Sequence, residues 1–339
     1  MQQIVIPKPG APGVLRLEEA ADPTPMAGEV RIRTVAAGIN FADIMARLGL
    51  YPDAPPFPCV VGYEAAGVVD AVGAGVTDIK EGDQAVALTR FGGYSTVVCT
   101  PQAQVVKAPP GADLHALAAL PVQYLTAWLM LVHLGNVRAG EKVLVHSVGG
   151  GVGLAAVQIC KWRGAEVIGT ASAGKHERLR AMGVDHCIDY RTQDFAVEVK
   201  RITDGRGVDI VLDAQGGSSF RKSYESLADL GRLFLFGAAN LATGEKRNLI
   251  AVLRGLLSMP KFGSIPLMDQ NRGVFGVNLG HLWHRVDDLR GMLGEITGLV
   301  ADGTFKPVID ATFPFAQAAE AHAYIQARKN FGKVLLTVA

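Results

Sequence analysis

A cluster of glycines follows a short apolar run near the middle of the chain. The run covers residues 142–145, the cluster residues 149–153, and a stretch of small residues continues to residue 158. This order predicts a strand, a tight turn and a helix, because glycine lets a backbone turn sharply and come close to a ligand. The start of a helix offers unpaired N–H groups and a positive dipole end, which bind anions. The pyrophosphate of a dinucleotide is the usual anion at such a turn.

The spacing of these glycines differs from the standard Gly-x-Gly-x-x-Gly, although Gly150 and Gly153 keep its last interval. A glycine-rich turn can also be a tight turn and nothing more. Further apolar runs at residues 166–170, 208–213 and 231–237 follow at helix-length intervals. That alternation is typical of an α/β fold with a doubly wound parallel sheet, and it favours the nucleotide interpretation.

The composition excludes several classes of protein. The chain has 339 residues, enough for one large or two ordinary domains, and its formal net charge of +1 gives no case for binding nucleic acid or an anionic membrane. No apolar run approaches the roughly 20 residues of a membrane helix, and the N-terminus lacks the layout of a signal peptide. Four widely spaced cysteines indicate a reducing compartment. We therefore expect a cytoplasmic protein without a membrane span.

The two ends of the chain share a different pattern. Residues 1–110 contain short runs of period-two alternation bounded by glycine, aspartate and proline, which predict a small β-barrel. Strand-like runs return at residues 306–309 and 333–338. We expect the sheet domain to be inserted into a domain made from both ends of the chain. The expected boundaries are 1–120, 121–284 and 285–339.

Several motifs follow one another in the order of a known superfamily. They are Ala37-Gly38-Ile39-Asn40-Phe41-Ala42-Asp43, Gly62-Tyr63-Glu64-Ala65-Ala66-Gly67, Gly150-Gly151-Val152-Gly153, Gly169-Thr170-Ala171-Ser172 and Asn330-Phe331-Gly332-Lys333-Val334-Leu335. With them the chain resembles the medium-chain dehydrogenase/reductase superfamily, and within it the zinc-free quinone oxidoreductases and their vesicle amine transport protein-like branch. The resemblance implies a GroES-like β-barrel catalytic domain, a Rossmann NADP-binding domain, and a homodimer that pairs near residues 274–278.

The residues at the zinc positions of this superfamily predict that no metal is bound. Zinc members carry a cysteine, a Gly-His-Glu and a second cysteine, whereas this chain has Asn40, Gly62-Tyr63-Glu64 and Val122-Gln123. An amide and a phenol do not replace thiolate and imidazole as zinc ligands. Without a Lewis acid, the expected chemistry is hydride delivery to an already electrophilic acceptor, a quinone or an α,β-unsaturated carbonyl. We expect His133 and His146 to be structural.

The end of the second strand of the sheet domain predicts NADP(H) as the cofactor. A carboxylate there would bind a plain ribose, but residues 169–176 contain none. Ser172 and Lys175 could meet a 2′-phosphate instead, although Lys175 could also be a solvated lysine at a helix start. The resemblance adds Tyr190 beside the adenosine.

The resemblance also implies a wider set of cofactor contacts, of which any apolar member could equally belong to the core. The expected cofactor-binding residues are Asn40, Thr126, Gly150, Gly151, Val152, Gly153, Thr170, Ser172, Lys175, Tyr190, Phe236, Gly237, Phe275, Val277, Asn330 and Lys333.

Three candidate catalytic residues, Asn40, Asp43 and Tyr51, fall on the segment that faces the nicotinamide in the family. Tyr51 could donate a proton or hydrogen-bond an acceptor oxygen, and Asn40 could orient it. Asp43 could instead hold the segment together by bonding its backbone, and solvent could supply the proton. Positioning carries most of the catalysis in hydride transfer.

Two other functions stay open from the sequence. One is a non-enzymatic NADPH-binding regulatory or trafficking protein of the same fold. The other is an enoyl-thioester reductase, for which a basic patch at the pocket mouth would be the distinguishing feature. Residues 241–272, with an apolar stripe through Leu253, Leu256 and Leu257, could form a pocket wall, a subunit contact or a contact with a membrane surface.

Overall fold

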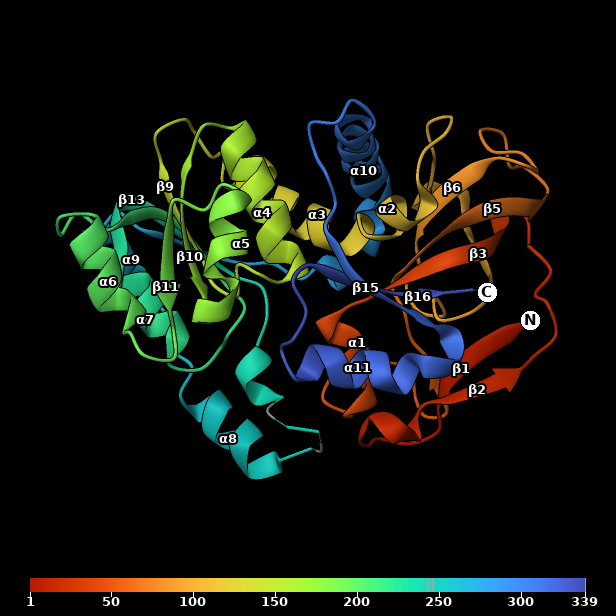
Figure 1. Cartoon of the computed structure of the whole chain (residues 1–339), viewed down its shortest axis with the longest axis horizontal. Coiled ribbons are helices and arrows are strands. Elements are labelled where there is room, and N and C mark those ends of the chain that lie inside the picture. Colours follow the sequence, from red (N-terminus) through yellow and green to blue (C-terminus); the bar gives the residue numbers. More distant parts are fainter. Residues whose placement is uncertain (243, 246, 339) are drawn as a thin grey trace. The chain divides into compact units, whose positions relative to one another are not determined.

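The computed structural model describes residues 1–242, 244–245 and 247–338, which form two compact units. Unit 1 consists of Met1–Leu125, Gly244–Arg247 and Leu279–Ala339, and unit 2 of Thr126–Thr243 and Asn248–Asn278. The first and the last described residues therefore both belong to unit 1 (Figure 1).

Unit 2 is built on a six-stranded parallel sheet with the order β11-β10-β9-β12-β13-β14. The strands are mostly apolar and buried, as in β9 and β12, because both faces of the sheet are covered. This strand order is that of the dinucleotide-binding doubly wound fold, so the predicted fold class is confirmed. The strands are β9 (Lys142–Val145), β10 (Glu166–Ala171), β11 (His186–Asp189), β12 (Val208–Asp213), β13 (Leu227–Leu235) and β14 (Gly273–Gly276).

Right-handed crossovers place helices on both faces of this sheet. Helices α4 (Gly151–Trp162) and α5 (His176–Ala181) follow β9 and β10, whereas α6 (Phe195–Ile202) and α7 (Ser219–Glu225) cover the other face (Figure 1). The chain builds the sheet outward in one direction from β9 and in the opposite direction from β12. Ligands of such sheets bind at the carboxyl ends of these two strands, where the strand order reverses. Helix α3 (Pro121–Trp128) leads into the unit.

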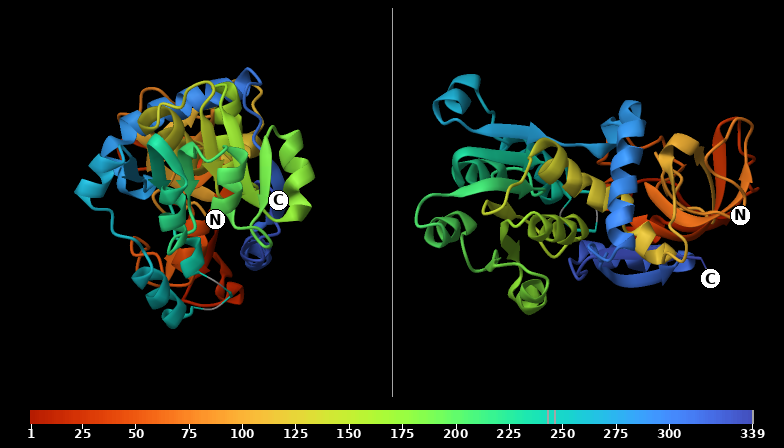
Figure 2. Two further views of the ribbon diagram at one scale, coloured as in Figure 1. Left: turned by 90° about the vertical axis from the view of Figure 1, so that its left-hand side faces the viewer. Right: turned by 90° about the horizontal axis from the view of Figure 1, so that it is seen from above.

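Unit 1 contains two sheets. Seven strands follow the path β15-β16-β3-β5-β6-β8, with β7 paired to β3, and three form the sheet β2-β1-β4. They curve around one another near the N-terminus (Figure 2, right), as expected for a GroES-like barrel. The strands are β1 (Gln2–Ile6), β2 (Arg16–Glu19), β3 (Glu29–Ile39), β4 (Cys59–Val60), β5 (Glu64–Val72), β6 (Gln84–Leu88), β7 (Val97–Pro101), β8 (Val105–Lys107), β15 (Ile309–Pro314) and β16 (Lys333–Thr337).

The long strand β3 organises unit 1, because it pairs with β5, β7 and β16. Two register shifts bend it where it crosses β5, and a Cβ at Gly67 would lie 1.9 Å from the Arg33 carbonyl oxygen. Only glycine allows the two strands to approach so closely. The helices of this unit are α1 (Phe41–Arg47), α2 (Leu114–Ala118), α10 (Val286–Ala301) and α11 (Ala318–Gln326).

The segment 241–272 contains α8 (Leu249–Leu257) and α9 (Ser264–Asp269). Its residues Thr243 and Lys246 lie outside the described part of the chain. The side chains of Ile250 and Leu257 on α8 are 67% and 77% exposed. The described chain therefore leaves this apolar face uncovered. Among the described helices, none combines the length and the apolar character needed to cross a membrane.

Candidate functional site

A buried ammonium group joins three strands of unit 1. Lys333, at the start of β16, is 1% exposed, and its Nζ donates to Asn40 Oδ1 at 2.8 Å and to Glu64 Oε1. The Asn40 Nδ2 group also donates to Glu64 Oε1, at 2.7 Å, and the second Glu64 oxygen accepts the Val122 N–H at 2.8 Å. Each buried charge thus has an opposite charge and further hydrogen bonds, which is the condition under which ions are tolerated in an interior.

Strand pairing brings these residues together from distant parts of the sequence. β3 lies between β16 and β5, Asn40 directly follows β3, and Glu64 and Lys333 begin the two flanking strands. Position 38 requires glycine, since a Cβ there would lie 2.3 Å from Glu64 Oε1 and 2.6 Å from Lys333 Cε. Lys333 is an expected cofactor contact, but its ammonium group is buried in this ion pair. Any effect of Lys333 on a cofactor would therefore pass through Asn40.

The donors around this group are unlike those of a zinc centre. Asn40 and Tyr63 offer an amide and a phenol, and Lys333 already supplies a positive charge to Glu64. Tetrahedral zinc sites use thiolate, imidazole and carboxylate ligands. In the part of the chain that the structure describes, no three histidine, cysteine, aspartate or glutamate side chains gather in a way that could hold a metal ion. The residues present do not fit a zinc ion.

Asp43 holds the backbone of the segment that carries Asn40. It is fully buried, and its two oxygens accept the Asn40 N–H at 2.7 Å and the Gly62 N–H at 3.0 Å. Burial raises the pKa of Asp43 to about 7, although the hydrogen bond from the Asn40 backbone and the charge of Lys333 oppose that rise. These bonds favour the positional role over direct participation in the chemistry.

A chain of hydrogen bonds leads from the buried guanidinium of Arg47 to Tyr94. The Tyr94 hydroxyl lies 3.1 Å from His322 Nε2, and Arg47 Nη1 lies 3.3 Å from His322 Nδ1. Arg47 can only donate, so His322 Nδ1 accepts and Nε2–H donates to Tyr94. Burial, followed by the charge of Arg47, lowers the pKa of His322 to about 3, which keeps the ring neutral. The hydrogen bonds therefore run in one direction, from Arg47 to Tyr94.

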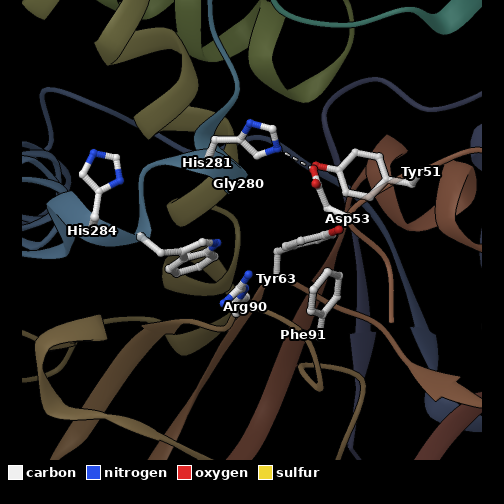
Figure 3. A pocket seen from close by; sticks show the side chains of 9 residues that line it. Tyr51, Asp53, Tyr63, Arg90, Phe91, Gly280, His281 and His284 are labelled. Atoms are coloured by element: carbon white, nitrogen blue, oxygen red, sulfur yellow. Dashed lines mark hydrogen bonds and ion pairs between the residues drawn. The ribbon is translucent and has the colours of Figure 1, made fainter. Parts of the chain in front are cut away.

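Unit 1 also holds a pocket of about 400 Å³ with aromatic and charged walls (Figure 3). Tyr63 lies 5.3 Å from Phe91 and 6.2 Å from Tyr51 between ring centroids. Burial, followed by the negative charge of Asp43, raises the pKa of Tyr63, so its hydroxyl stays protonated. The remaining walls are formed by Asp53, Arg90, Gly280, His281, Trp283 and His284. Tyr51, an expected catalytic residue, thus lines a cavity large enough for a small aromatic molecule.

In unit 2, the turn after β9 has the geometry of an anion site. Gly150 caps the twelve-residue helix α4, and residues 151–153 form its first turn, whose N–H groups have no partner within the helix. A Cβ at Gly153 would lie 2.5 Å from the Val148 carbonyl oxygen, so only glycine permits the helix to pack this closely. These residues fit the pyrophosphate of a dinucleotide.

The expected 2′-phosphate contacts lie on two neighbouring strand ends. β10 and β11 are parallel, with Ala171 opposite Asp189, so Ser172 and Tyr190 directly follow at the same edge of the sheet. Ser172 is half-buried and Tyr190 is 41% exposed. Lys175 ends the short 3₁₀ helix that follows Ser172. Residues 169–176 at the end of β10 carry no carboxylate, whereas β11 ends in Asp189, whose oxygens accept the Arg191 N–H at 3.1 Å and the Thr192 hydroxyl at 3.2 Å.

A network of buried hydrogen bonds holds the backbone at Ser147, just before the glycine turn. Ser223 donates to Asp213 Oδ2 at 2.7 Å, so its oxygen accepts from His146 Nε2–H at 3.0 Å. His146 Nδ1 must then accept from the Thr170 hydroxyl at 3.1 Å, and that hydroxyl accepts the Ser147 N–H at 3.3 Å. Burial lowers the pKa of His146, against the charge of Asp213, which keeps the ring neutral. The expected structural role of His146 agrees with these contacts.

The remaining expected cofactor contacts of unit 2 differ in burial and in whether their polar groups already have partners. The hydroxyl of Thr170 is buried and used inside the network, so it does not face a ligand. Phe236 is half-buried and Gly237 exposed after β13. The Phe275 ring stacks on Phe234 at 5.0 Å, and the Val277 N–H donates to the Leu235 carbonyl at 2.9 Å.

Two further expected contacts lie close to the ends of the units. Thr126 is buried in α3, the first residue of unit 2. In unit 1, the Asn330 side chain donates to the Gly332 carbonyl at 2.9 Å and thereby shapes the turn before Lys333.

Comparison with known proteins agrees with this architecture. The alcohol dehydrogenase GroES-like domain matches residues 26–110, and the zinc-binding dehydrogenase family matches residues 182–336. The human synaptic vesicle membrane protein VAT-1 homolog is 44% identical over 323 residues, which covers 95% of this chain and 82% of that protein.

The chain belongs to the medium-chain dehydrogenase/reductase superfamily.

Solved structures of this superfamily include enzymes of two kinds. Escherichia coli quinone oxidoreductase complexed with NADPH superposes with a TM-score of 0.88 at 29% identity and covers 99% of this chain and 100% of that chain. CurK enoyl reductase gives a TM-score of 0.86 at 30% identity and covers 100% and 99%. One matching family is described as zinc-binding, whereas the amide, phenol and ammonium groups at the site of this chain do not fit zinc.

Several residues of this site were not predicted as part of it. Glu64 lies in a motif of the superfamily, but its ion pair with Lys333 depends on the pairing of β5, β3 and β16. Arg90 and the histidines at positions 281 and 284 reach one pocket from separate segments, and the sequence gives no spacing signal for them. The Asp209-Ile210-Val211-Leu212-Asp213 run could have indicated an acid at the carboxyl end of a strand.

The pKa of Asp43 makes stability depend on pH in a defined direction. The pKa of Asp43 is about 7 in the folded chain and has its ordinary value of 3.8 in the unfolded chain. Between these two pH values, only the folded chain holds the proton. The stabilisation is complete below the lower value and is lost as pH rises through the upper one. We expect the free energy of unfolding to fall by up to about 1.4 kcal/mol per pH unit from this group. Urea unfolding between pH about 5 and about 7 measures it, and the Asp43→Asn variant should lose this slope. Parallel curves for the wild type and the variant would contradict the expectation.

The hydroxyl of Thr170 is the group that links His146 to the turn. Thr170→Val leaves His146 Nδ1 and the Ser147 N–H without their partner, and we expect a loss of about 2 kcal/mol in the free energy of unfolding. Thr170→Ser keeps the hydroxyl and should lose clearly less. Urea unfolding of both variants tests this, and equal losses would show that the hydroxyl makes no contribution.

Proposed function

We propose that this superfamily member is an NADPH-dependent, zinc-independent reductase that transfers hydride to a quinone or an α,β-unsaturated carbonyl. The observation that carries the proposal is the buried Lys333–Glu64–Asn40 group, because an ammonium and an amide give no Lewis acid to polarise an unactivated carbonyl. The acceptor must then be electrophilic by itself. The family and the fit of residues 150–153 to a pyrophosphate support the cofactor.

NADPH, when bound, supplies the hydride, and each turnover also takes one proton, so that a quinone becomes a hydroquinone and NADP⁺ is formed. The first-turn N–H groups of α4 would hold the pyrophosphate, and Ser172, Lys175 and Tyr190 the 2′-phosphate. This assignment is supported by the position of these residues at the carboxyl edge of β10 and β11. The end of β10 carries no carboxylate that would bind a plain ribose, and the Asp189 carboxylate at the end of β11 accepts hydrogen bonds from Arg191 and Thr192.

The pocket of unit 1 would bind the acceptor. Its rings at positions 51, 63 and 91 can pack against a planar conjugated molecule. The Tyr51 hydroxyl would donate to the acceptor oxygen or deliver the proton, and solvent is the alternative source. Asn40 has its carbonyl bonded to Lys333 and its amide nitrogen to Glu64, so it would act with one fixed orientation.

We further propose a homodimer in the cytoplasm. β14 is an edge strand that pairs with β13 alone among the described strands, which leaves one backbone edge for a second copy. The relatives named for the synaptic vesicle membrane give a second possibility for where the protein works.

A second candidate function is the reduction of an enoyl thioester. The likeness to CurK enoyl reductase favours it, as does the presence of Arg90 in the pocket. Both reactions deliver hydride to a conjugated carbonyl compound, so they differ in the acceptor and share the cofactor.

The direct test is an assay of NADPH oxidation by the purified protein with a panel of quinones, enals and enoyl thioesters. We expect turnover with at least one conjugated acceptor and none with a saturated aldehyde of similar size. Tight NADPH binding without turnover of any acceptor would contradict the enzymatic proposal and favour a regulatory or trafficking role.

Lys175 gives a test of the cofactor that does not need an acceptor. Lys175→Met should weaken NADPH binding about tenfold or more, because a charge-assisted bond to the 2′-phosphate is lost, and leave NADH binding almost unchanged. Calorimetric titration with both nucleotides measures this. Lys200→Met, an exposed lysine on α6, is the matched control. An equal loss for NADPH and NADH would contradict the assignment of Lys175.

A further inference from the structure

Hydride transfer to a neutral quinone or enone does not use the guanidinium charge in the pocket of unit 1. Arg90, His281 and His284 line this pocket, together with one carboxylate, Asp53. That carboxylate has a partner, since its Oδ2 lies 2.8 Å from His281 Nε2.

Among the described residues that line the pocket, Arg90 is the charged side chain without an internal partner. It follows β6 in the chain, and among the described residues no hydrogen bond or ion pair reaches its guanidinium. Two other arginines of unit 1 have internal partners, Arg31 with Asp70 at 2.8 Å and Arg290 with Asp78 at 3.3 Å. Figure 3 shows Arg90 beside Tyr63 on one side of the pocket, with His281 on the segment across from it. A guanidinium can bind an oxyanion in a bidentate manner, through two parallel N–H···O hydrogen bonds.

We propose that the acceptor carries an oxyanion, a carboxylate or a phosphate, and that Arg90 binds it while the aromatic walls hold the conjugated part. The proposal rests on the proposed reductase function and narrows its substrate class. Aromatic rings provide the contact area, and the single guanidinium fixes the end of the molecule that lies near it. A neutral quinone would leave Arg90 solvated and would gain nothing from it.

The test compares acceptor pairs that differ only in the anion. The carboxylate pair is an enone acid and its methyl ester, and the phosphate pair is crotonyl-4′-phosphopantetheine and crotonyl-pantetheine. We expect the wild type to prefer the anionic member of at least one pair by about 10-fold or more in kcat/KM. Preference in the first pair identifies a carboxylate acceptor, and preference in the second pair a phosphate-bearing carrier.

Variants of Arg90 distinguish an effect of its charge on acceptor binding from an effect on folding. Arg90→Met should abolish the preference, with the larger loss of kcat/KM for the anionic member, while Arg90→Lys should keep part of the preference. Arg16→Gln removes the same charge from the exposed strand β2 and should change neither value. A wild-type preference for the neutral member of both pairs, or a preference that survives in Arg90→Met, overturns the proposal.

A binding measurement keeps the two proposals distinguishable. Calorimetric titration with 2-naphthoate and its methyl ester needs no turnover. We expect the wild type to bind the acid at least about tenfold more tightly than the ester and Arg90→Met to lose that difference. If no acceptor is reduced but the acid binds through Arg90, the reductase proposal fails and the anion site stands. If acceptors are reduced without any such difference, the anion site fails.

Discussion

The ion pair between Lys333 and Glu64 is the interaction on which unit 1 depends. Both side chains are fully buried, and moving two such charges out of water costs several kcal/mol for each. That cost is offset only because Asn40 and the Val122 backbone complete the hydrogen bonds of the pair. The pair therefore fixes the relative positions of β16, β3, β5 and the start of α3. A cation that is part of the protein thus occupies the polar centre of the site.

Unit 2 is organised by a second buried acid in a comparable way. Asp213, at the carboxyl end of β12, accepts from Ser219 and Ser223 and bonds the Gln215 backbone. Through Ser223, His146 and Thr170 it reaches the Ser147 N–H, where the backbone has a left-handed φ of 53°. Such a conformation in a residue other than glycine is costly and persists where surrounding bonds hold it. The ends of β9, β10 and β12 are thus connected beneath the turn assigned to the cofactor.

The sequence predicted the architecture because its patterns are local. Mostly apolar runs alternating with helix-length segments defined the sheet of unit 2, and the glycines at 150–153 marked the turn before α4. The structure places Asn40 in the buried group with Lys333 and Tyr51 in the wall of the pocket. The partners of Lys333 could not be read from sequence spacing, because strand pairing joins residues near both ends of the chain. The one-directional chain of hydrogen bonds from Arg47 through His322 to Tyr94 depends on tertiary contacts in the same way.

The central claim is that an internal ammonium group takes the place of a metal in a working reductase. Metal content and turnover measured on the same sample test it most directly. The account predicts NADPH oxidation with a conjugated acceptor by protein that contains far less than one zinc ion per chain, at a rate that a chelator does not change. Activity that rises in proportion to bound zinc, or that disappears with the chelator and returns with added zinc, would contradict it.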